Sequence, residues 1–240
     1  MQALIIGYGF VGKATELTLR SMGVDPITIH DPQAGFSAQV KWDFDCVFIC
    51  VPTNLRDGKL ETDIVDEVYN KFKGHQIIRS TLPPESVCLY PEATIWPEFL
   101  REVTFNIDAT QPQVRDVVGI KEIEGNMFYD LIRKHRAVDA VTPKEAAMFK
   151  MSRNAFLATK VTFANELRKK CLLLDIDYDA VKSLLQPSLD PATHWDVPGP
   201  DGKFGFGGKC LPKDTTHYAT LSQDVLSSII LMLNTSHRED

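Results

Sequence analysis

The sequence predicts an α/β protein, in which a doubly wound parallel sheet is followed by an all-α region built on one long helix. Short apolar segments alternate with amphipathic ones over residues 3–141. This alternation is typical of β-α-β units, whose crossovers place helices on the faces of a parallel sheet. A helical pattern then continues from residue 142 to about residue 174 without a breaker. We expect a short helix at 178–186, then a loop rich in Gly and Pro, a helix from about Lys213 and a last helix near the end of the sequence.

The first element is a strand, tight turn and helix over residues 3–23. Gly7, Gly9 and Gly12 form a GxGxxG pattern between the strand and the helix, and the next strand ends in Asp31, 19 residues after Gly12. In this context the glycines permit a tight turn that holds a pyrophosphate at the helix N-terminus. Asp31 would accept hydrogen bonds from a ribose, and no Arg follows it closely to hold a 2′-phosphate. The unit therefore predicts a Rossmann-type domain that binds NAD rather than NADP; a purely structural glycine turn is the alternative.

Strands and helices continue to alternate after this unit. We expect strands at 46–51, 75–80, 93–96, 116–120 and 137–141, and helices at 62–73 and 126–135. The segments VPT (51–53) and STLPP (80–84) follow two of these strands. Ligands of doubly wound folds bind at the carboxyl ends of the strands, so both segments are candidate cofactor loops. Alternatively, their prolines simply end the strands.

The long helix begins with a recognisable N-terminus. Thr142 is a good N-cap, Pro143 suits the first helical position and Glu145 completes a capping box. Lys150 and Asn154 are four residues apart and so share one face of this helix. They either form a solvated stripe or project a cation and an amide into a pocket.

Apolar side chains occur on more than one face of the same helix, which therefore needs several neighbours. One neighbour could be the same helix of a second subunit. The apolar residues concerned are Met148, Met151, Phe156, Val161, Phe163 and Leu167.

Cys210 stands apart from the other cysteines. It follows three glycines in GFGGKCLPKD (205–214) and is flanked by Lys209 and Lys213, and nearby cations favour the nucleophilic thiolate. The remaining four lie among apolar residues, and we expect them in the core: Cys46, Cys50, Cys88 and Cys171. An odd count of five cysteines at irregular spacing fits the reducing cytoplasm, and no His/Cys pair has metal-ligand spacing, so we expect no metal.

Composition excludes several classes of protein. The charged residues are mixed in sign and the formal net charge is −6, which argues against a nucleic-acid partner, because such a partner would need a basic patch. No apolar run is long enough to span a membrane, and the N-terminus lacks the features of a signal peptide.

Together, the motifs resemble the UDP-glucose/GDP-mannose dehydrogenase family over essentially the whole chain. GYGFVG, VPT, STLPP, PEFLRE, KMSRNAFLATKVTFANE and GFGGKCLPKD occur in the order found in that family. The resemblance implies that a nucleotide sugar's primary alcohol is oxidised to a carboxylate with two NAD, as part of polysaccharide biosynthesis. Cys210 would add to the intermediate aldehyde, and the resulting thiohemiacetal would become a thioester that water releases.

The resemblance also implies a role for individual residues. Lys150 would stabilise oxyanions with Asn154 beside it, and Asp214 would help take the alcohol proton. Glu98 would activate water against the thioester and Thr81 would position that water, whereas Glu102 is either a second site carboxylate or a surface residue. The implied cofactor-binding set is Gly7, Tyr8, Gly9, Phe10, Val11, Gly12, Asp31, Val51, Pro52, Thr53, Ser80, Thr81 and Cys210. The implied substrate-binding set is Glu98, Phe99, Leu100, Glu102, Lys150, Asn154, Phe204, Gly205, Gly207 and Cys210.

We expect an NAD-binding domain over 1–140 and a helical, dimerising domain with the cysteine over 141–240. We also expect the family's third, nucleotide-binding domain to be absent, and Ala192 stands where the family often carries Arg. A homodimer through the long helix is the expected assembly. Two alternatives remain open: an NAD-binding subunit whose partner chain supplies the nucleotide site, and a two-electron dehydrogenase of a small hydroxy acid, which would need Lys150 and Asn154 but no thiol.

Overall fold

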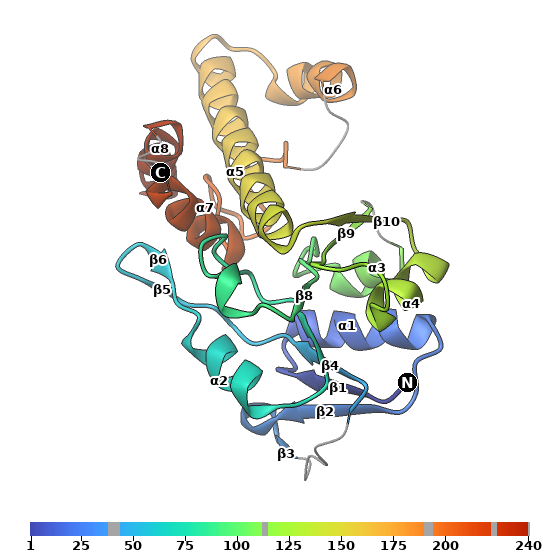
Figure 1. Ribbon diagram of the computed structural model, residues 1–240. Helices are drawn as coiled ribbons and strands as arrows, with labels where there is room; N and C mark the ends of the chain where they lie inside the picture. The colour runs from blue at the N-terminus through green and yellow to red at the C-terminus, as the bar shows by residue number, and fades with distance from the viewer. Residues whose placement is uncertain (38–43, 112–114, 190–193, 222–224, 240) are drawn as a thin grey trace. The chain divides into compact units, whose positions relative to one another are not determined.

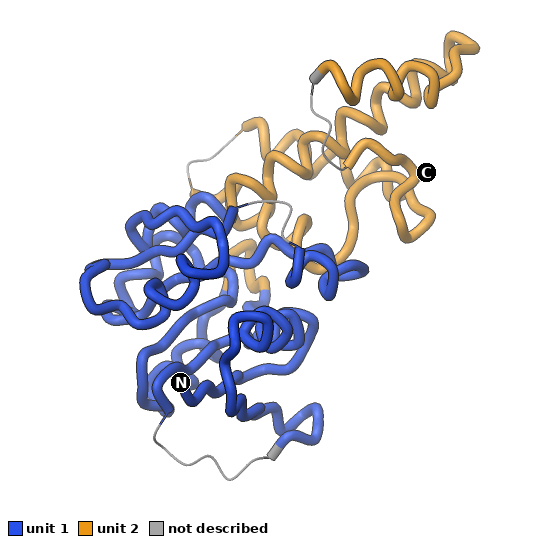
Figure 2. Tube along the Cα trace, turned by 90° about the vertical axis from the view of Figure 1, so that its right-hand side faces the viewer, with its two compact units in different colours: residues 1–54, 61–150 blue, residues 55–60, 151–240 orange. Residues whose placement is uncertain are grey.

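A computed structural model describes residues 1–37, 44–111, 115–189, 194–221 and 225–239 of the chain. The chain divides into two compact units (Figure 2). Unit 1 comprises residues 1–54 and 61–150, and unit 2 comprises residues 55–60 and 151–240.

Unit 1 is built on an eight-stranded sheet in the described part of the chain (Figure 1), with the strand order β10-β9-β8-β7-β4-β1-β2-β3. Pairing is parallel except where β3 meets β2 and where β9 meets β8. The order reverses between β1 and β4, and this switch point is where doubly wound folds bind ligands. The strands are β1 (Ala3–Ile6), β2 (Ile27–Asp31), β3 (Phe36–Ser37), β4 (Cys46–Ile49), β7 (His75–Ile78), β8 (Thr94–Ile95), β9 (Asp116–Gly119) and β10 (Val138–Val141).

Helices cover both faces of the sheet because successive strand side chains point to opposite sides. Ile5 packs in the cluster that includes residues of α1 (Phe10–Ser21) and α4 (Met127–His135). Its neighbour Ile6 packs in the cluster that includes α2 (Asp63–Lys71). A short helix α3 (Phe105–Thr110) packs on α1, and two 3₁₀ turns, η1 (Pro32–Ala34) and η2 (Val87–Leu89), complete the unit.

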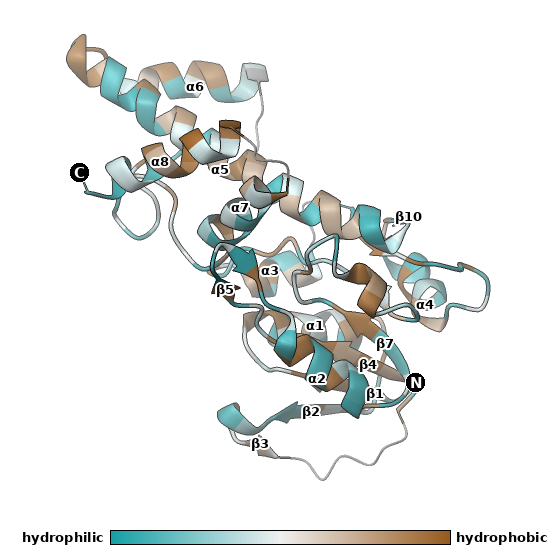
Figure 3. Ribbon diagram, turned by 60° about the vertical axis from the view of Figure 1, so that its left-hand side comes forward, coloured by the Kyte–Doolittle hydropathy of each residue, from teal (hydrophilic) through white to brown (hydrophobic). Residues whose placement is uncertain are grey.

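Unit 2 is helical apart from a hairpin. Its helices are α5 (Pro143–Leu173), whose first eight residues fall in unit 1, α6 (Tyr178–Leu189), α7 (Cys210–Thr220) and α8 (Val225–Glu239). The hairpin consists of β5 (Leu55–Arg56) and β6 (Lys59–Leu60), and it packs on α7, where the Leu60 amide donates to His217 Nδ1 at 2.9 Å. Figure 3 colours much of α8 hydrophobic, and Ile230 of α8 lies in the core of this unit.

The predicted fold class is confirmed, including the long helix. Its capping box forms as expected, since Glu145 Oε2 accepts from the Thr142 amide at 2.8 Å and Thr142 Oγ1 accepts from the Glu145 amide at 3.3 Å. The hairpin of unit 2 and α3 were not predicted.

Two expectations were wrong. Cys88 is exposed rather than buried, because in the short turn η2 its neighbour Val87 takes the inward position. Helix α7 begins at Cys210 and not near Lys213. Pro212 lies in its first turn, where a missing N–H breaks no helical hydrogen bond. No helix among the described residues has both the length and the apolar character needed to cross a membrane.

Candidate active site

The first glycine-rich loop of unit 1 is closed by contacts between backbone atoms. Gly7 adopts φ +85°, and a Cβ there would lie 2.8 Å from the carbonyl oxygen of Cys50. A Cβ at Gly12 would lie 2.1 Å from the carbonyl oxygen of Gly7, whereas a Cβ at Gly9 would have no heavy atom within 4 Å. Gly7 and Gly12 are thus required by the turn itself, and Gly9 leaves open space at the N-terminus of α1.

Asp31 lies beside this loop at the end of β2. Its Oδ2 accepts from the Tyr8 amide at 2.7 Å, and its Oδ1 accepts from the Ala34 amide at 3.1 Å. The Tyr8 hydroxyl donates to Glu16 on α1. Burial and this carboxylate raise the pKa of Tyr8 to about 12. The carboxylate of Asp31 is therefore fixed against the loop, as a ribose ligand would require.

The other predicted cofactor residues follow neighbouring strands. Phe10 and Val11 form the first turn of α1. Val51, Pro52 and Thr53 follow β4, and Ser80 and Thr81 follow β7. Ser80 Oγ donates to the Val51 carbonyl at 2.6 Å, which ties these two loops together. The carboxyl ends of β1, β4 and β7 thus carry the unit 1 members of the set, while Cys210 of the same set belongs to unit 2.

A buried ion pair joins Glu98 and Lys150 in unit 1. Lys150 Nζ donates to Glu98 Oε1 and to the Glu98 carbonyl, each at 2.7 Å, and the Leu100 amide donates to Oε2 at 2.8 Å. Both side chains are about 95% buried. Burial would raise the pKa of Glu98, but Lys150 and these hydrogen bonds hold it below its ordinary value. Both members of the pair are therefore charged. The ring of Phe99 lies beside them, with its centroid 5.8 Å from Lys150 Nζ.

Sequence reasoning missed Arg79, a buried cation near this pair. Its guanidinium carbon lies 3.6 Å from the ring centroid of Trp96, and its Nε and Nη1 have no hydrogen-bond partner. Burial lowers the pKa of Arg79. An Arg at the end of an apolar strand, directly before the predicted Ser80 loop, was the available signal.

In unit 2, Cys210 is the first residue of α7 and is partly buried. A helix N-terminus favours the thiolate form of a cysteine. One turn later Asp214 is fully buried; its Oδ2 accepts from Asn154 Nδ2 at 2.6 Å and its Oδ1 accepts from Lys213 Nζ at 2.7 Å. Asn154 and Asp214, which were predicted as site residues, therefore contact each other directly.

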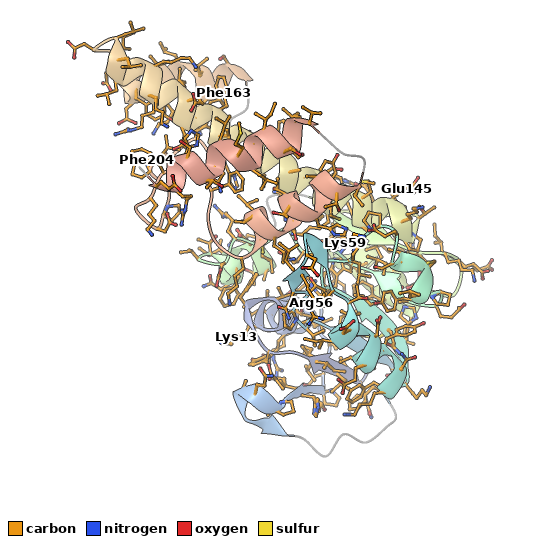
Figure 4. All side chains as sticks on the ribbon, turned by 90° about the vertical axis from the view of Figure 1, so that its left-hand side faces the viewer. Lys13, Arg56, Lys59, Glu145, Phe163 and Phe204 are labelled. Carbon is orange, nitrogen blue, oxygen red and sulfur yellow. The ribbon has the colours of Figure 1, made fainter. Side chains whose placement is uncertain are left out.

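The glycines before Cys210 differ in their surroundings. A Cβ at Gly205 would lie 2.5 Å from Asn234 Oδ1, and one at Gly207 would lie 2.8 Å from Arg238 Nη1. A Cβ at Gly208 would have no heavy atom within 4 Å. Gly205 and Gly207 thus make room for α8, and Gly208 faces open space. Phe204 opens this loop and is half-buried, with the Arg168 guanidinium carbon 5.6 Å from its ring centroid (Figure 4 labels Phe204).

The remaining predicted residues lie as follows. Glu102 is exposed, whereas Thr81, Phe99 and Leu100 are half-buried. Ala192 lies outside the described residues. Among the residues described, no three or more His, Cys, Asp or Glu side chains gather in an arrangement that could hold a metal ion.

A glycine loop at the switch point of a parallel sheet, followed by a helical unit on one long helix, is an arrangement typical of nucleotide-dependent dehydrogenases. Residues 144–236 match the family model described as "UDP-glucose/GDP-mannose dehydrogenase family, central domain". The chain carries the central domain of that family, and the resemblance inferred from the motifs is confirmed.

Individual proteins are similar to this chain in sequence or in fold. The chain is 30% identical over 231 residues to a GDP-mannose 6-dehydrogenase of Pseudomonas savastanoi pv. phaseolicola, covering 80% of this chain and 50% of that protein. A UDP-glucose dehydrogenase structure from Pyrobaculum islandicum matches with a TM-score of 0.75 at 21% identity, covering 98% of this chain and 68% of that one. The chain spans about half the length of the curated GDP-mannose dehydrogenases it matches.

The fold alone is shared more widely. A 3-hydroxyisobutyrate dehydrogenase of Mycobacterium tuberculosis matches with a TM-score of 0.70 at 17% identity, covering 100% of this chain and 94% of that one.

Proposed function

We propose that this chain takes part in the NAD-dependent, four-electron oxidation of a nucleotide sugar's primary alcohol to the uronic acid, and that UDP-glucose is the first substrate to try. The observation that carries the proposal is the placement of Cys210 at the first turn of α7, four residues before a fully buried Asp214 that Asn154 binds. A reactive thiol serves this reaction because it can retain the aldehyde between the two oxidations.

The first glycine-rich loop of unit 1 fits NAD. Gly9 leaves space where a Cβ would stand, and the Asp31 carboxylate, which accepts from the Tyr8 amide, would bind the ribose. The N-terminal amides of α1 would hold the pyrophosphate, and the loops after β4 and β7 would line the nicotinamide side through Thr53, Ser80 and Thr81. Two NAD molecules, bound one after the other, would each accept one hydride.

The chain's own residues would handle the protons and the covalent steps. Asp214, with Asn154 beside it, would take the alcohol proton as the aldehyde forms. The Cys210 thiolate would then add to the aldehyde carbon to give a thiohemiacetal, and loss of the second hydride from that carbon would leave a thioester. Water would attack the thioester carbonyl, and the C–S bond would break to release the acid and restore the thiol.

Glu98 and Lys150 would serve the hydrolysis and the oxyanions. The lowered pKa of Glu98 keeps the carboxylate ionised, as a base that takes a proton from water must be. Thr81 would orient this water. Lys150 would stabilise negative charge on the substrate oxygen, a role usually worth a factor of about 10²–10³ in rate. Phe99, Leu100, Phe204, Gly205 and Gly207 are proposed to contact the substrate, whereas the exposure of Glu102 favours its reading as a surface residue.

We further propose an NAD-binding domain at 1–140 and a helical cysteine domain at 141–240 that forms a homodimer through α5. Phe156 is 60% exposed and Phe163 is 51% exposed on this helix (Figure 4 labels Phe163), and burying them against a second copy would be favourable. Sedimentation showing only monomer at micromolar concentration would contradict the dimer. Five free thiols favour a cytoplasmic location.

The test is product analysis by mass spectrometry. The purified chain is mixed with NAD and a panel of nucleotide sugars, and NADH is counted per product molecule. Two NADH per uronate are expected. One NADH per product would favour a two-electron dehydrogenase, and NAD binding without turnover of any nucleotide sugar would favour a subunit that needs a partner chain.

A further inference from the structure

The backbone of the cysteine loop is held by side chains from two helices of unit 2. The Gly205 amide donates to Asn165 Oδ1 of α5 at 3.1 Å, and the Phe206 amide donates to Asn234 Oδ1 of α8 at 2.6 Å. Asn234 Nδ2 in turn donates to the Phe206 carbonyl at 3.1 Å. The side-chain amide of Asn234 therefore forms hydrogen bonds with both the amide and the carbonyl of Phe206, as a neighbouring β-strand would.

The side chains of Asn165 and Asn234 are themselves held in position by neighbouring contacts. Asn165 is 99% buried, and its Nδ2 donates to the Val161 carbonyl of α5 at 2.7 Å, which fixes the direction of its Oδ1. On α8, His237 lies one turn beyond Asn234, and its Nε2 is 2.7 Å from Glu166 Oε1 of α5. This contact anchors α8 to α5 and sets the position from which Asn234 reaches the loop.

The glycines of the loop leave the space that these side chains occupy. A Cβ at Gly205 would stand 2.5 Å from Asn234 Oδ1. One at Gly207 would stand 2.9 Å from Asp201 Oδ2, which Arg238 Nη1 binds at 2.7 Å. The approach of α8 thus favours glycine at both positions, more strongly at Gly205 than at Gly207, where the ends of two flexible side chains would have to move. Phe206 precedes Cys210 by four residues, so the conformation fixed at Phe206 passes through Gly207, Gly208 and Lys209 to the first residue of α7.

We propose that Asn234 is a positioning residue, which holds the cysteine loop in the conformation that presents Cys210 at the N-terminus of α7. This inference rests on the proposed function for its meaning in catalysis, but the position of the thiol can be measured without substrate. Loss of the Nδ2 donor would leave the Phe206 carbonyl without this bond and loosen the turn into α7.

The test is the pH dependence of Cys210 alkylation by iodoacetamide, followed by peptide mass spectrometry. It uses the full chain with Cys88→Ser, since Cys88 is exposed and Cys46, Cys50 and Cys171 are buried. The variants are Asn234→Ala and Asn234→Asp; the second keeps the size and the acceptor but replaces the donor with a charged oxygen facing the Phe206 carbonyl. The matched control is Thr235→Ala on the same helix. The exposed hydroxyl of Thr235 donates to the Leu231 carbonyl of α8 at 3.2 Å.

In both Asn234 variants, we expect the alkylation midpoint to differ from that of the parent by about 0.5 pH unit or more, because the thiol would no longer be held at a helix N-terminus, which favours the thiolate. The alkylation midpoint of Thr235→Ala should equal that of the parent. A lower melting temperature with an unchanged Cys210 midpoint in both Asn234 variants would overturn the proposal, because Asn234 would then be structural only. If Asn234→Ala does not fold, the isosteric Asn234→Asp carries the test.

A second readout uses whichever nucleotide sugar the parent oxidises. The Asn234 variants should lose about tenfold or more in kcat, the loss expected for one buried hydrogen bond, with KM for NAD within about twofold of the parent. An unchanged kcat would count against the proposal. If the parent oxidises no nucleotide sugar, the proposed function fails, and the alkylation profile alone decides the role of Asn234.

Discussion

The two glycine-rich loops of the chain are similar in sequence but are closed by different means. In residues 7–12 the closest approaches are to backbone atoms of Cys50, Val51 and Gly7, all of which lie within unit 1. In residues 205–208 the close approaches are to side-chain atoms of Asn234 and Arg238 on α8 and of Asp201. A loop closed by its own backbone can be recognised from local sequence, whereas a loop closed by distant side chains cannot.

The largest expected effect comes from Gly12→Ala. Its Cβ would stand 2.1 Å from a carbonyl oxygen that no side-chain movement can clear, so we expect a loss of about 3 kcal/mol or more in the free energy of unfolding. Gly9→Ala is the matched variant, because its Cβ meets no atom within 4 Å. It should unfold like the parent in urea but bind NAD about tenfold more weakly, since a Cβ would fill the space left for the pyrophosphate. Equal free energies of unfolding for Gly12→Ala and Gly9→Ala would contradict the claim that backbone contacts close the first loop.

The corresponding pair in the second loop is Gly205→Ala and Gly208→Ala. Both glycines have positive φ, +72° and +76°, so both substitutions carry backbone strain of about 1 kcal/mol. Only at Gly205 does the Cβ meet Asn234, and we expect a total loss of about 3 kcal/mol there. Urea unfolding of both variants checks this, and adding Asn234→Ala should recover part of the loss at Gly205 and none at Gly208.

A smaller effect is expected for Gly207→Ala. Its Cβ would meet the flexible end of Arg238, which can move, so the loss should be about 1 kcal/mol. In a double-mutant cycle with Arg238→Ala, the two losses should not add. Simple additivity in urea unfolding would mean that α8 does not approach Gly207 in solution.

The smallest expected effect is on the pH dependence of the free energy of unfolding, to which the buried pair of Glu98 and Lys150 contributes and the two glycine-rich loops do not. The pKa of Glu98 is lowered in the folded chain, so the pair with Lys150 stabilises the fold above the unfolded carboxyl pKa of about 4.3. This contribution is lost as the pH falls through the folded value. Unfolding free energies measured from pH 7 down to pH 3 should therefore fall more steeply in the parent than in the double variant Glu98→Gln/Lys150→Met. Parallel curves would show that the pair is not charged as described.

Sequence reasoning succeeded where the signal is local. The GxGxxG turn and the capping box of Thr142 and Glu145 each depend on residues close in the chain, and both form in the structure. Asp31 lies beside the turn, and its role as a ribose ligand stays a prediction. It failed at Cys88, whose neighbours are apolar but whose turn points it outward.

The contacts that organise the site are mostly long-range. Lys150 and Glu98 are 52 residues apart, Asn154 and Asp214 are 60 apart, and Asn234 and Phe206 are 28 apart. Their pairing depends on how the helices pack, which no residue pattern specifies. A partial signal did exist for Asn234, because Ser227, Asn234 and His237 place polar groups on the side of α8 that also carries the buried Ile230.

The central claim is that Cys210 carries the substrate covalently, and the most direct test is the intact mass of the chain quenched by acid during turnover. Glu98→Gln should slow hydrolysis of the thioester, so that an adduct accumulates with NAD and a nucleotide sugar that the parent oxidises. The account predicts a mass increase that maps to the Cys210 peptide and is absent in Cys210→Ser, which should form no acid. Acid formation by Cys210→Ser at the parent's rate, with the Cys210 peptide of Glu98→Gln unmodified, would contradict it.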